Sequence, residues 1–185
     1  MNMKSVFTVA LLAFTVVGSW AQGLYMTRNG KVSFFSKTPM ENIEAVNNEV
    51  SSILNTETGE IVFAILIKSF HFERALMEEH FNENYMESAK IPKSTFQGRI
   101  TNLSSIDFEK DGMYPASVEG DLTIHGVKQR ISSSGTVTVE NDQVSVASAL
   151  SLKPGDYDIR IPSLVSEKIA KSIDVKINCA YVPKQ

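Results

Sequence analysis

Apolar and polar residues alternate over the last strand-length segment of the chain, residues 173–181. Every second residue there is Ile, Val, Cys or Tyr, and this period of two places all of those side chains on one face of a β-strand. Residues 144–152 repeat the pattern, and Val137 and Val139 end a third alternating run that reaches 144–152 through a short loop at 140–142. Cys179 lies on the buried face of the last segment, so we expect a small core residue there and not a nucleophile.

Turn signals separate further short apolar runs. Asn29-Gly30 lies between 24–28 and 31–36, and Asn-Gly is a strong signal for a two-residue hairpin turn. Residues 56–59 separate the runs 50–55 and 60–67, and Lys153-Pro154-Gly155-Asp156 suits a type II turn. Many short strands with turns between them predict an antiparallel barrel or sandwich.

Residues 61–72 do not alternate between apolar and polar. Their odd-numbered and even-numbered positions are both mostly apolar, so both faces of a strand here would be apolar. A strand of this kind needs apolar contacts on both faces, which a barrel lumen and a covering helix would supply. A helix is predicted directly afterwards, over 73–82, which contains no Gly, Pro or β-branched residue. A second short helix is predicted at 163–171, after Pro162, with Leu164, Val165 and Ile169 facing inward.

Length and charge limit the class of protein. The chain has 185 residues, with 18 basic and 21 acidic side chains and a formal net charge of -3. This length fits one domain, and a charge so close to neutral argues against a nucleic-acid-coating protein. The single cysteine excludes an internal disulfide and a cysteine-rich zinc site. No repeat, low-complexity tract or linker divides the chain.

The N-terminal segment has the layout of a secretory signal peptide. Lys4 precedes an apolar stretch at 6–17, and Ser19-Trp20-Ala21 supplies small residues on either side of Trp20. We expect cleavage after Ala21, which would leave a single domain at 22–185 in the periplasm or outside the cell. Twelve apolar residues are too few for a membrane-spanning helix of about 20 residues, and no later run is long enough.

Candidate catalytic chemistry is sparse. Glu78-Glu79-His80 lies on the predicted helix and His71 precedes it, so a metal-dependent or acid/base site around His71, His80 and Glu78 is an alternative to a solvated acidic helix face. His125-Gly126 is typical of a turn. The sequence contains no G-x-S-x-G elbow, Walker-type loop or G-x-G-x-x-G motif. We therefore expect a protein that is not an enzyme and needs no metal or other cofactor.

Two segments resemble a known family. Residues 118–128, VEGDLTIHGVK, are similar to the v-x-G-x-L-T-i-H-G-v-t-k signature of the YceI-like family of lipid/polyisoprenoid-binding proteins. Residues 79–92, EHFNENYMESAKIP, and the pair Thr95-Phe96 are similar to that family's helix, loop and following strand. At family positions that usually hold other residues, the chain has Met77, Glu78, Phe81, Met86 and Ile91.

The resemblance implies a mainly β fold: an antiparallel, extended lipocalin-like barrel of about eight strands with one or two covering helices. It implies an exported binding or carrier protein whose lumen holds an isoprenoid or other lipid-like chain. The near-neutral charge indicates no nucleic-acid partner, and the sequence leaves open whether the barrel forms a homodimer. A module with a filled core and no ligand is a further alternative. By strand parity, the candidate lumen residues are Phe35, Phe63, Ile65, Val144, Val146 and Leu150.

Overall fold

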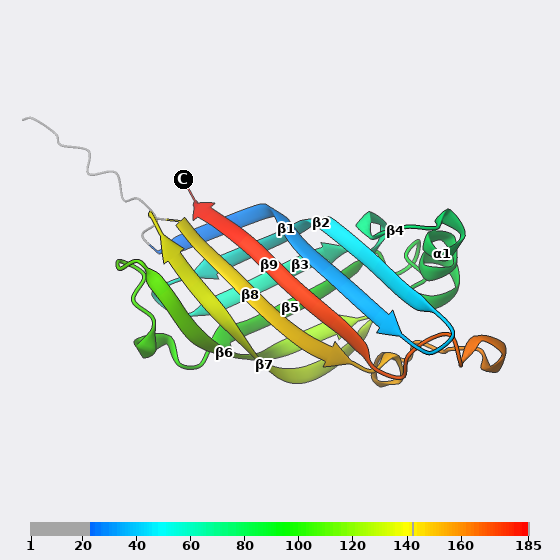
Figure 1. Ribbon diagram of the computed structural model, residues 1–185. Helices are drawn as coiled ribbons and strands as arrows, with labels where there is room; N and C mark the ends of the chain where they lie inside the picture. The colour runs from blue at the N-terminus through cyan, green and yellow to red at the C-terminus, as the bar shows by residue number, and fades with distance from the viewer. Residues whose placement is uncertain (1–22, 142, 185) are drawn as a thin grey trace, which may run out of the picture.

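A closed antiparallel β-barrel forms most of the structure, a computed structural model that describes residues 23–141 and 143–184 (Figure 1). The eight strands of the barrel are β1 (Leu24–Lys37), β2 (Asn42–Asn55), β3 (Glu60–Leu66), β5 (Lys93–Ile100), β6 (Gly112–Ile124), β7 (Val127–Glu140), β8 (Gln143–Leu152) and β9 (Ile173–Pro183). They follow the order β1-β9-β8-β7-β6-β5-β3-β2, and the pairing of β2 with β1 closes the ring. The two-residue strand β4 (His71–Phe72) pairs only with β2. The predicted mainly β barrel is confirmed.

Helical segments are short. They are α1 (Ala75–His80), the π-helical turn η2 (Phe81–Tyr85) and the 3-10 turns η1 (Ile67–Ser69), η3 (Leu103–Ser105), η4 (Pro154–Tyr157) and η5 (Ser163–Val165). The predicted helix over 73–82 therefore exists as α1 and η2 together. None of the described helices has the length and apolar character to cross a membrane.

The second predicted helix, over 163–171, is wrong beyond its first turn. Only η5 is helical there, and Leu164 is exposed although we predicted that it faces inward. The backbone amide of Ala170 donates to Oγ of Ser36 on β1 at 2.8 Å. This tertiary contact uses an amide that a continuous helix would direct to a carbonyl four residues earlier.

The alternating C-terminal strands lie as the sequence predicts. Every apolar residue predicted on one face of β9 is buried or half-buried, and Cys179 is a buried free thiol. Val146 pairs with Cys179 across β8 and β9, and Glu140 pairs with Gln143 at the hairpin between β7 and β8. The core role of Cys179 is confirmed.

The predicted hairpin at Asn29-Gly30 is wrong, because β1 runs straight through both residues. Neither has the positive φ that a type I′ turn requires, and β1 carries register shifts at this point instead. A Cβ on Gly30 would lie 2.5 Å from Sγ of Cys179. Glycine is needed here for close packing between β1 and β9, a tertiary requirement that the local sequence does not display.

Side chains fill one end of the barrel and leave the other end open. Buried residues close the end near the chain termini: Leu54, Ile106, Val137, Val139, Val144, Cys179 and Tyr181. There, the hydroxyls of Tyr181 and Ser52 lie 2.7 Å apart, and Ser52 also donates to the carbonyl of Val62. The segment α1–η2 lies at the opposite end together with η4 and η5 (Figure 1). The predicted helix does not cover the outer face of β3, because Val62 and Leu66 on that face are exposed.

Candidate functional site

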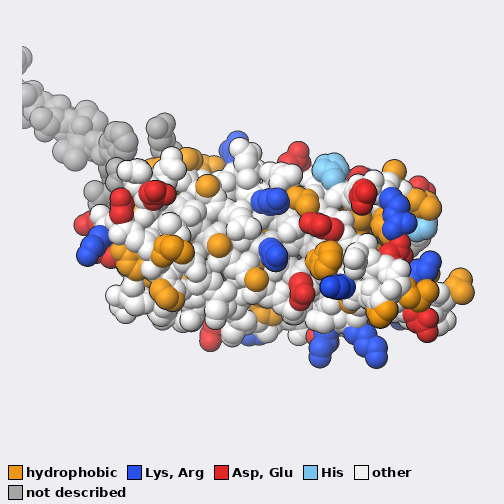
Figure 2. Space-filling model, viewed as in Figure 1, with side chains coloured by type: hydrophobic (Ala, Val, Ile, Leu, Met, Phe, Trp, Pro, Cys, Tyr) orange, Lys and Arg blue, Asp and Glu red, His pale blue; other side chains and the backbone are white. Residues whose placement is uncertain are grey.

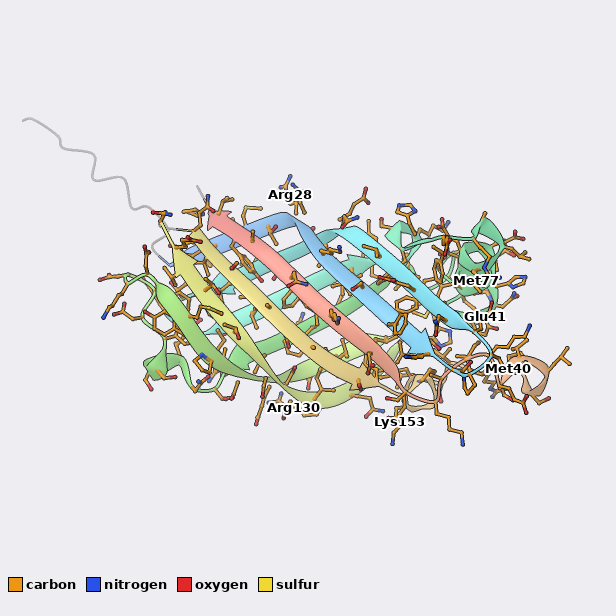
Figure 3. All side chains as sticks on the ribbon, viewed as in Figure 1. Arg28, Met40, Glu41, Met77, Arg130 and Lys153 are labelled. Atoms are coloured by element: carbon orange, nitrogen blue, oxygen red, sulfur yellow. The ribbon has the colours of Figure 1, made fainter. Side chains whose placement is uncertain are left out.

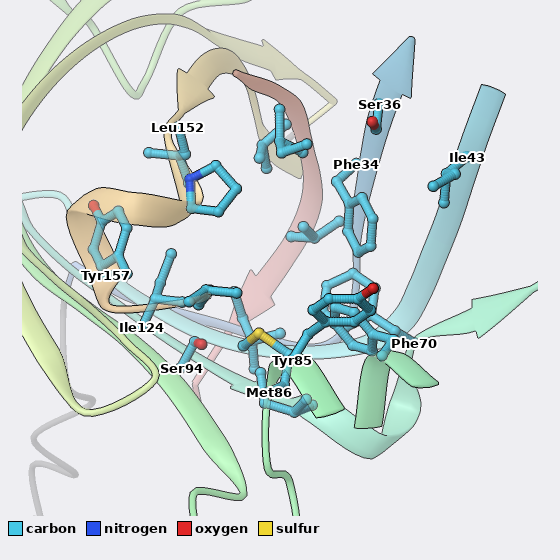
Figure 4. A pocket seen from close by; sticks show the side chains of 18 of the residues that line it. Phe34, Ser36, Ile43, Phe70, Tyr85, Met86, Ser94, Ile124, Leu152 and Tyr157 are labelled. Carbon is cyan, nitrogen blue, oxygen red and sulfur yellow. The ribbon is translucent and has the colours of Figure 1, made fainter. Parts of the chain in front are cut away.

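A deep cavity of about 550 Å³ occupies the open half of the barrel. Its walls are the inward faces of the strands, and its mouth lies between α1–η2 and the segment that holds η4 and η5 (Figure 4). This volume lies within the range of known small-molecule pockets, about 300–1,000 Å³. The described residues that line it are overwhelmingly aliphatic or aromatic, so the cavity suits an apolar ligand.

Four of the six candidate lumen residues line this cavity. Phe63 and Ile65 reach it from β3, and Val146 and Leu150 reach it from β8. Val144 shares the inward face of β8 but lies deeper, within the packed core at the closed end. Whether any of them contacts a ligand stays a prediction.

Phe35 was assigned to the wrong face of β1. Phe34 lines the cavity, whereas Phe35 lies on the opposite face with Lys31 and Lys37. Two neighbouring phenylalanines make the parity of the strand ambiguous, and a shift by one residue exchanges its faces. The two lysines, four positions before and two positions after Phe35, could have identified the solvent face.

Four phenylalanines from different elements form an aromatic cluster near the mouth. Phe34 of β1, Phe70, Phe72 of β4 and Phe81 of η2 have ring centroids 5.1–5.7 Å apart in five close pairs. Their tilted and edge-on arrangements are those that aromatic rings favour. The cluster attaches the α1–η2 cap to the barrel wall. Phe70 and Phe72 belong to the segment 61–72, which the sequence shows to be apolar on both faces. The sequence does not indicate that they pack against Phe34.

A few hydroxyl groups interrupt the apolar lining. Ser133 and Ser148 lie deep in the cavity and satisfy each other, with oxygens 2.9 Å apart. Ser94 and Tyr157 are nearer the mouth and only 6% and 3% exposed, and their hydroxyls are among the few polar groups that line the cavity (Figure 4). Burial raises the pKa of Tyr157 above its ordinary value of 10.0, so its hydroxyl is protonated at neutral pH with or without this shift. The mouth therefore offers two neutral donors to an oxygen atom of a ligand.

Charged side chains occur only at the rim of the cavity. Arg74 forms an ion pair with Glu41 at the rim, and Lys153 and Lys168 also line the cavity, without an ion pair among the described residues. Met77 of α1 also lines this end of the cavity (Figure 3). Charge at the rim and apolar walls below it suit a ligand with one polar end.

The histidines of the alternative enzyme site are only partly brought together. Nδ1 of His71 lies 3.5 Å from Oε2 of Glu78, and that oxygen also accepts the amide of Phe72 at 3.1 Å. His80 lies at the cavity rim, and in the described part of the chain it forms no hydrogen bond or ion pair with His71 or Glu78. Among residues 23–141 and 143–184, no group of three His, Cys, Asp or Glu side chains could hold a metal ion.

The two motif segments contact each other in the structure. His125 and Gly126, with φ of 50° and 79°, form the two-residue turn between β6 and β7, which suits a type I′ turn. Nε2 of His125 lies 3.4 Å from Oε2 of Glu87 in the loop after η2, and Nδ1 lies 3.3 Å from the carbonyl oxygen of Tyr157. The turn therefore connects the α1–η2 cap with η4, on the two sides of the mouth.

The motif glycine has a packing role. Gly120 on β6 faces Gly98 on β5, and the ring of Phe96 lies over both. A Cβ on Gly120 would lie 2.5 Å from Cζ of Phe96. Phe96 in turn lines the cavity, so the two glycines allow an aromatic ring to lie flat against the wall.

Comparisons with known proteins agree with this fold. The model of the YceI-like domain matches residues 15–181. Among solved structures, a polyisoprenoid-binding domain from Saccharophagus degradans is similar over 88% of this chain and 99% of its own, with a TM-score of 0.77 and 16% identity. Burkholderia cenocepacia BcnA follows with a TM-score of 0.68, 17% identity and coverage of 83% and 96% of the two chains.

The Campylobacter jejuni YceI protein is similar over 100% of this chain and 94% of its own, with a TM-score of 0.55 and 13% identity. No curated protein matches by sequence. At these identities the solved structures show the fold alone, whereas the domain match covers most of the sequence. The cavity-bearing barrel, its two contacting motif segments and this match together show that the chain belongs to the YceI-like family.

Proposed function

We propose that this protein is an exported, non-catalytic carrier that holds one long apolar molecule, an isoprenoid or another lipid-like chain, in its barrel. The observation that carries the proposal is the cavity of about 550 Å³, which is apolar in depth, polar at its rim and open at one end. An extended apolar chain with one polar end matches this cavity, because its chain would lie against the apolar walls and its polar end at the polar rim. The proposal requires no chemical step.

Burial of an apolar chain supplies enough free energy for useful binding. Each buried methylene contributes about 0.8 kcal/mol, so ten buried carbons give about 8 kcal/mol before the cost of ordering the ligand. The corresponding dissociation constant is micromolar or somewhat weaker. Ser94 and Tyr157 would add hydrogen bonds to an acceptor oxygen at the polar end of the ligand.

Similarity to the Saccharophagus degradans domain favours an isoprenoid, because that protein is described as binding polyisoprenoids. Its 16% identity supports the ligand class only as part of the proposal. The apolar wall itself would accept isoprenoid and acyl chains, and comparison of the two kinds of probe distinguishes them.

Export is proposed from the N-terminal sequence alone, since residues 1–21 lie outside the described part of the chain. Their removal would leave 164 residues and eliminate Trp20, the only tryptophan. The intact mass of protein recovered from outside the cytoplasm tests this cleavage. Tryptophan fluorescence that persists in that protein would contradict it.

Native mass spectrometry and organic extraction of freshly purified protein test the carrier function. We expect a co-purifying lipid, and uptake of a polyprenyl or fatty-acyl probe by protein from which the lipid has been removed. Absence of both would refute the proposal.

A pair of neighbouring substitutions locates the ligand. Val146→Trp places an indole in the cavity, whereas Ala147→Trp places the same side chain on the outer face of β8. We expect loss of probe binding only in the first variant. Leu150→Trp, nearer the mouth, supplies the same test if Val146→Trp does not fold, and equal binding by the inward and outward variants would exclude the lumen as the site.

A further inference from the structure

Three large hydrophobic side chains project into solvent around the mouth of the cavity. Met40 is 62% exposed in the connection between β1 and β2, Leu76 is 60% exposed on α1, and Leu164 is 92% exposed on η5. Each lines the mouth itself or is next in sequence to a residue that does, namely Glu41 or Val165. We call these three side chains the mouth rim.

From the mouth rim we infer that the open end of the barrel docks onto a lipid bilayer and exchanges its ligand there. This inference rests on the proposed carrier function. Single exposed hydrophobic residues are common on soluble proteins. Here, however, three of them come from separate elements and surround one opening, so that a flat surface placed against this end would contact all three.

The contents of the cavity identify the partner as a bilayer. An apolar chain that left through water would lose the favourable free energy of burial for every methylene exposed. With the mouth rim inserted among lipid headgroups, the chain passes from the acyl layer into the cavity without that exposure. Leu76 at the rim and the phenylalanines of the Phe34 cluster line the same cavity.

Charge adds an attraction on one side of the mouth. Lys153 and Lys168 line the opening, Lys171 is exposed three residues after Lys168, and none has an ion pair among the described residues. Figure 2 shows basic side chains, in blue, with acidic ones, in red, at the end of the molecule that carries the mouth. Anionic headgroups attract such lysines within a Debye length of the surface. The α1 side carries Glu78 and Glu79, so the electrostatic attraction is local and the apolar contact is expected to dominate.

Vesicle flotation tests the docking with a matched control. Leu164→Ser combined with Met40→Ser removes two side chains of the mouth rim. Met113→Ser removes a methionine that is 74% exposed at the start of β6, at the closed end of the barrel. On vesicles of phosphatidylcholine with an equal part of phosphatidylglycerol, we expect partition to fall on the order of tenfold or more for each rim side chain. We expect no change for Met113→Ser, and a smaller loss for Lys168→Gln that added salt removes.

A transfer assay separates this inference from the carrier function. The rim variant should bind a fluorescent polyprenyl probe in solution as tightly as the unchanged protein, but should take it up from vesicles more slowly. Equal flotation and equal transfer rates for the rim variant and Met113→Ser would overturn the docking and leave the carrier function intact. Self-association that Leu164→Ser abolishes, without vesicle binding, would also overturn it and identify a second copy of the chain as the partner. Failure of every form to bind the probe would refute the carrier function itself.

Discussion

Nε2 of His125 lies 3.4 Å from Oε2 of Glu87, and both residues adopt the left-handed backbone conformation. Lys90 approaches the other carboxylate oxygen, Oε1, with its Nζ at 2.5 Å. This one carboxylate therefore joins the turn between β6 and β7 to the loop that ends the α1–η2 cap. The contact fixes the position of the cap relative to the mouth.

The first prediction concerns the pH dependence of this contact. Lys90 and then His125 lower the pKa of Glu87 from its ordinary value of 4.5. A lowered pKa in the folded state stabilises the fold above the unfolded pKa, and this stabilisation is lost as the pH falls through the folded value. Glu87→Gln should therefore lower the melting temperature at neutral pH and make little difference well below pH 4.5.

Glu83→Gln is the control for that measurement, because Glu83 is exposed on the same segment and forms no ion pair among the described residues. Its melting temperature should follow that of the unchanged protein at both pH values. A Glu87→Gln variant that behaves in the same way would show that the contact contributes nothing.

The second prediction concerns the attachment of the cap. Phe81→Ala removes the ring that contacts Phe34, Phe70 and Phe72. We therefore expect the free energy of unfolding to fall by an amount near the lower end of about 3–5 kcal/mol. Amide hydrogen exchange should accelerate over 75–85 before it does in the barrel, and a bound probe should dissociate faster. Asn84→Ala, on the exposed side of η2, should change neither quantity. Uniform acceleration over all strands would contradict a local role.

The third prediction concerns the glycines below Phe96. Gly120→Ala places a Cβ 2.5 Å from the ring of Phe96 and 2.5 Å from the carbonyl of Gln97. A backbone carbonyl cannot move aside as the end of a flexible side chain can. We therefore expect the free energy of unfolding to fall by about 1–3 kcal/mol. Gly155→Ala has no atom within 4 Å of its new Cβ and should be neutral or slightly stabilising. Urea unfolding of the two variants measures the difference.

The fourth prediction concerns the only cysteine. Burial raises the pKa of the Cys179 thiol to about 11, so the reactive thiolate is scarce in the folded protein. A thiol reagent applied near the ordinary thiol pKa of about 8.5 should modify unfolded protein rapidly and folded protein very slowly. The unfolded thiol ionises first as the pH rises, so stability should decrease between these two pKa values. Rapid labelling of folded protein would show that β1 and β9 separate readily at this position.

The sequence was informative where one side of a strand faces water. Asp174, Lys176 and Asn178 mark the solvent face of β9, so the inward position of Cys179 followed from the alternation. The same reasoning failed at Phe35, because adjacent aromatic residues satisfy either register. It failed at Asn29-Gly30 because the glycine is required by Sγ of Cys179, about 150 residues away in the sequence.

The site residues that the sequence did not predict share one property. Their roles depend on contacts between segments that lie far apart in the sequence. Ser94 and Tyr157 line the same cavity only because β5 and η4 converge on the mouth. Glu87 gains its role from the turn at His125, and Phe81 from β1 and β4. Motif similarity identified the segments that hold several of these residues, but not their contacts.

The packed end of the barrel limits the route by which a ligand can enter and leave. With Leu54, Val137 and Tyr181 filling that end, a guest cannot pass straight through. If the protein carries a lipid as proposed, the lipid would enter and leave by the same opening, with its polar end outermost. The same face of the protein would then meet donor and acceptor one after the other, and a loaded molecule would have to turn round before delivery.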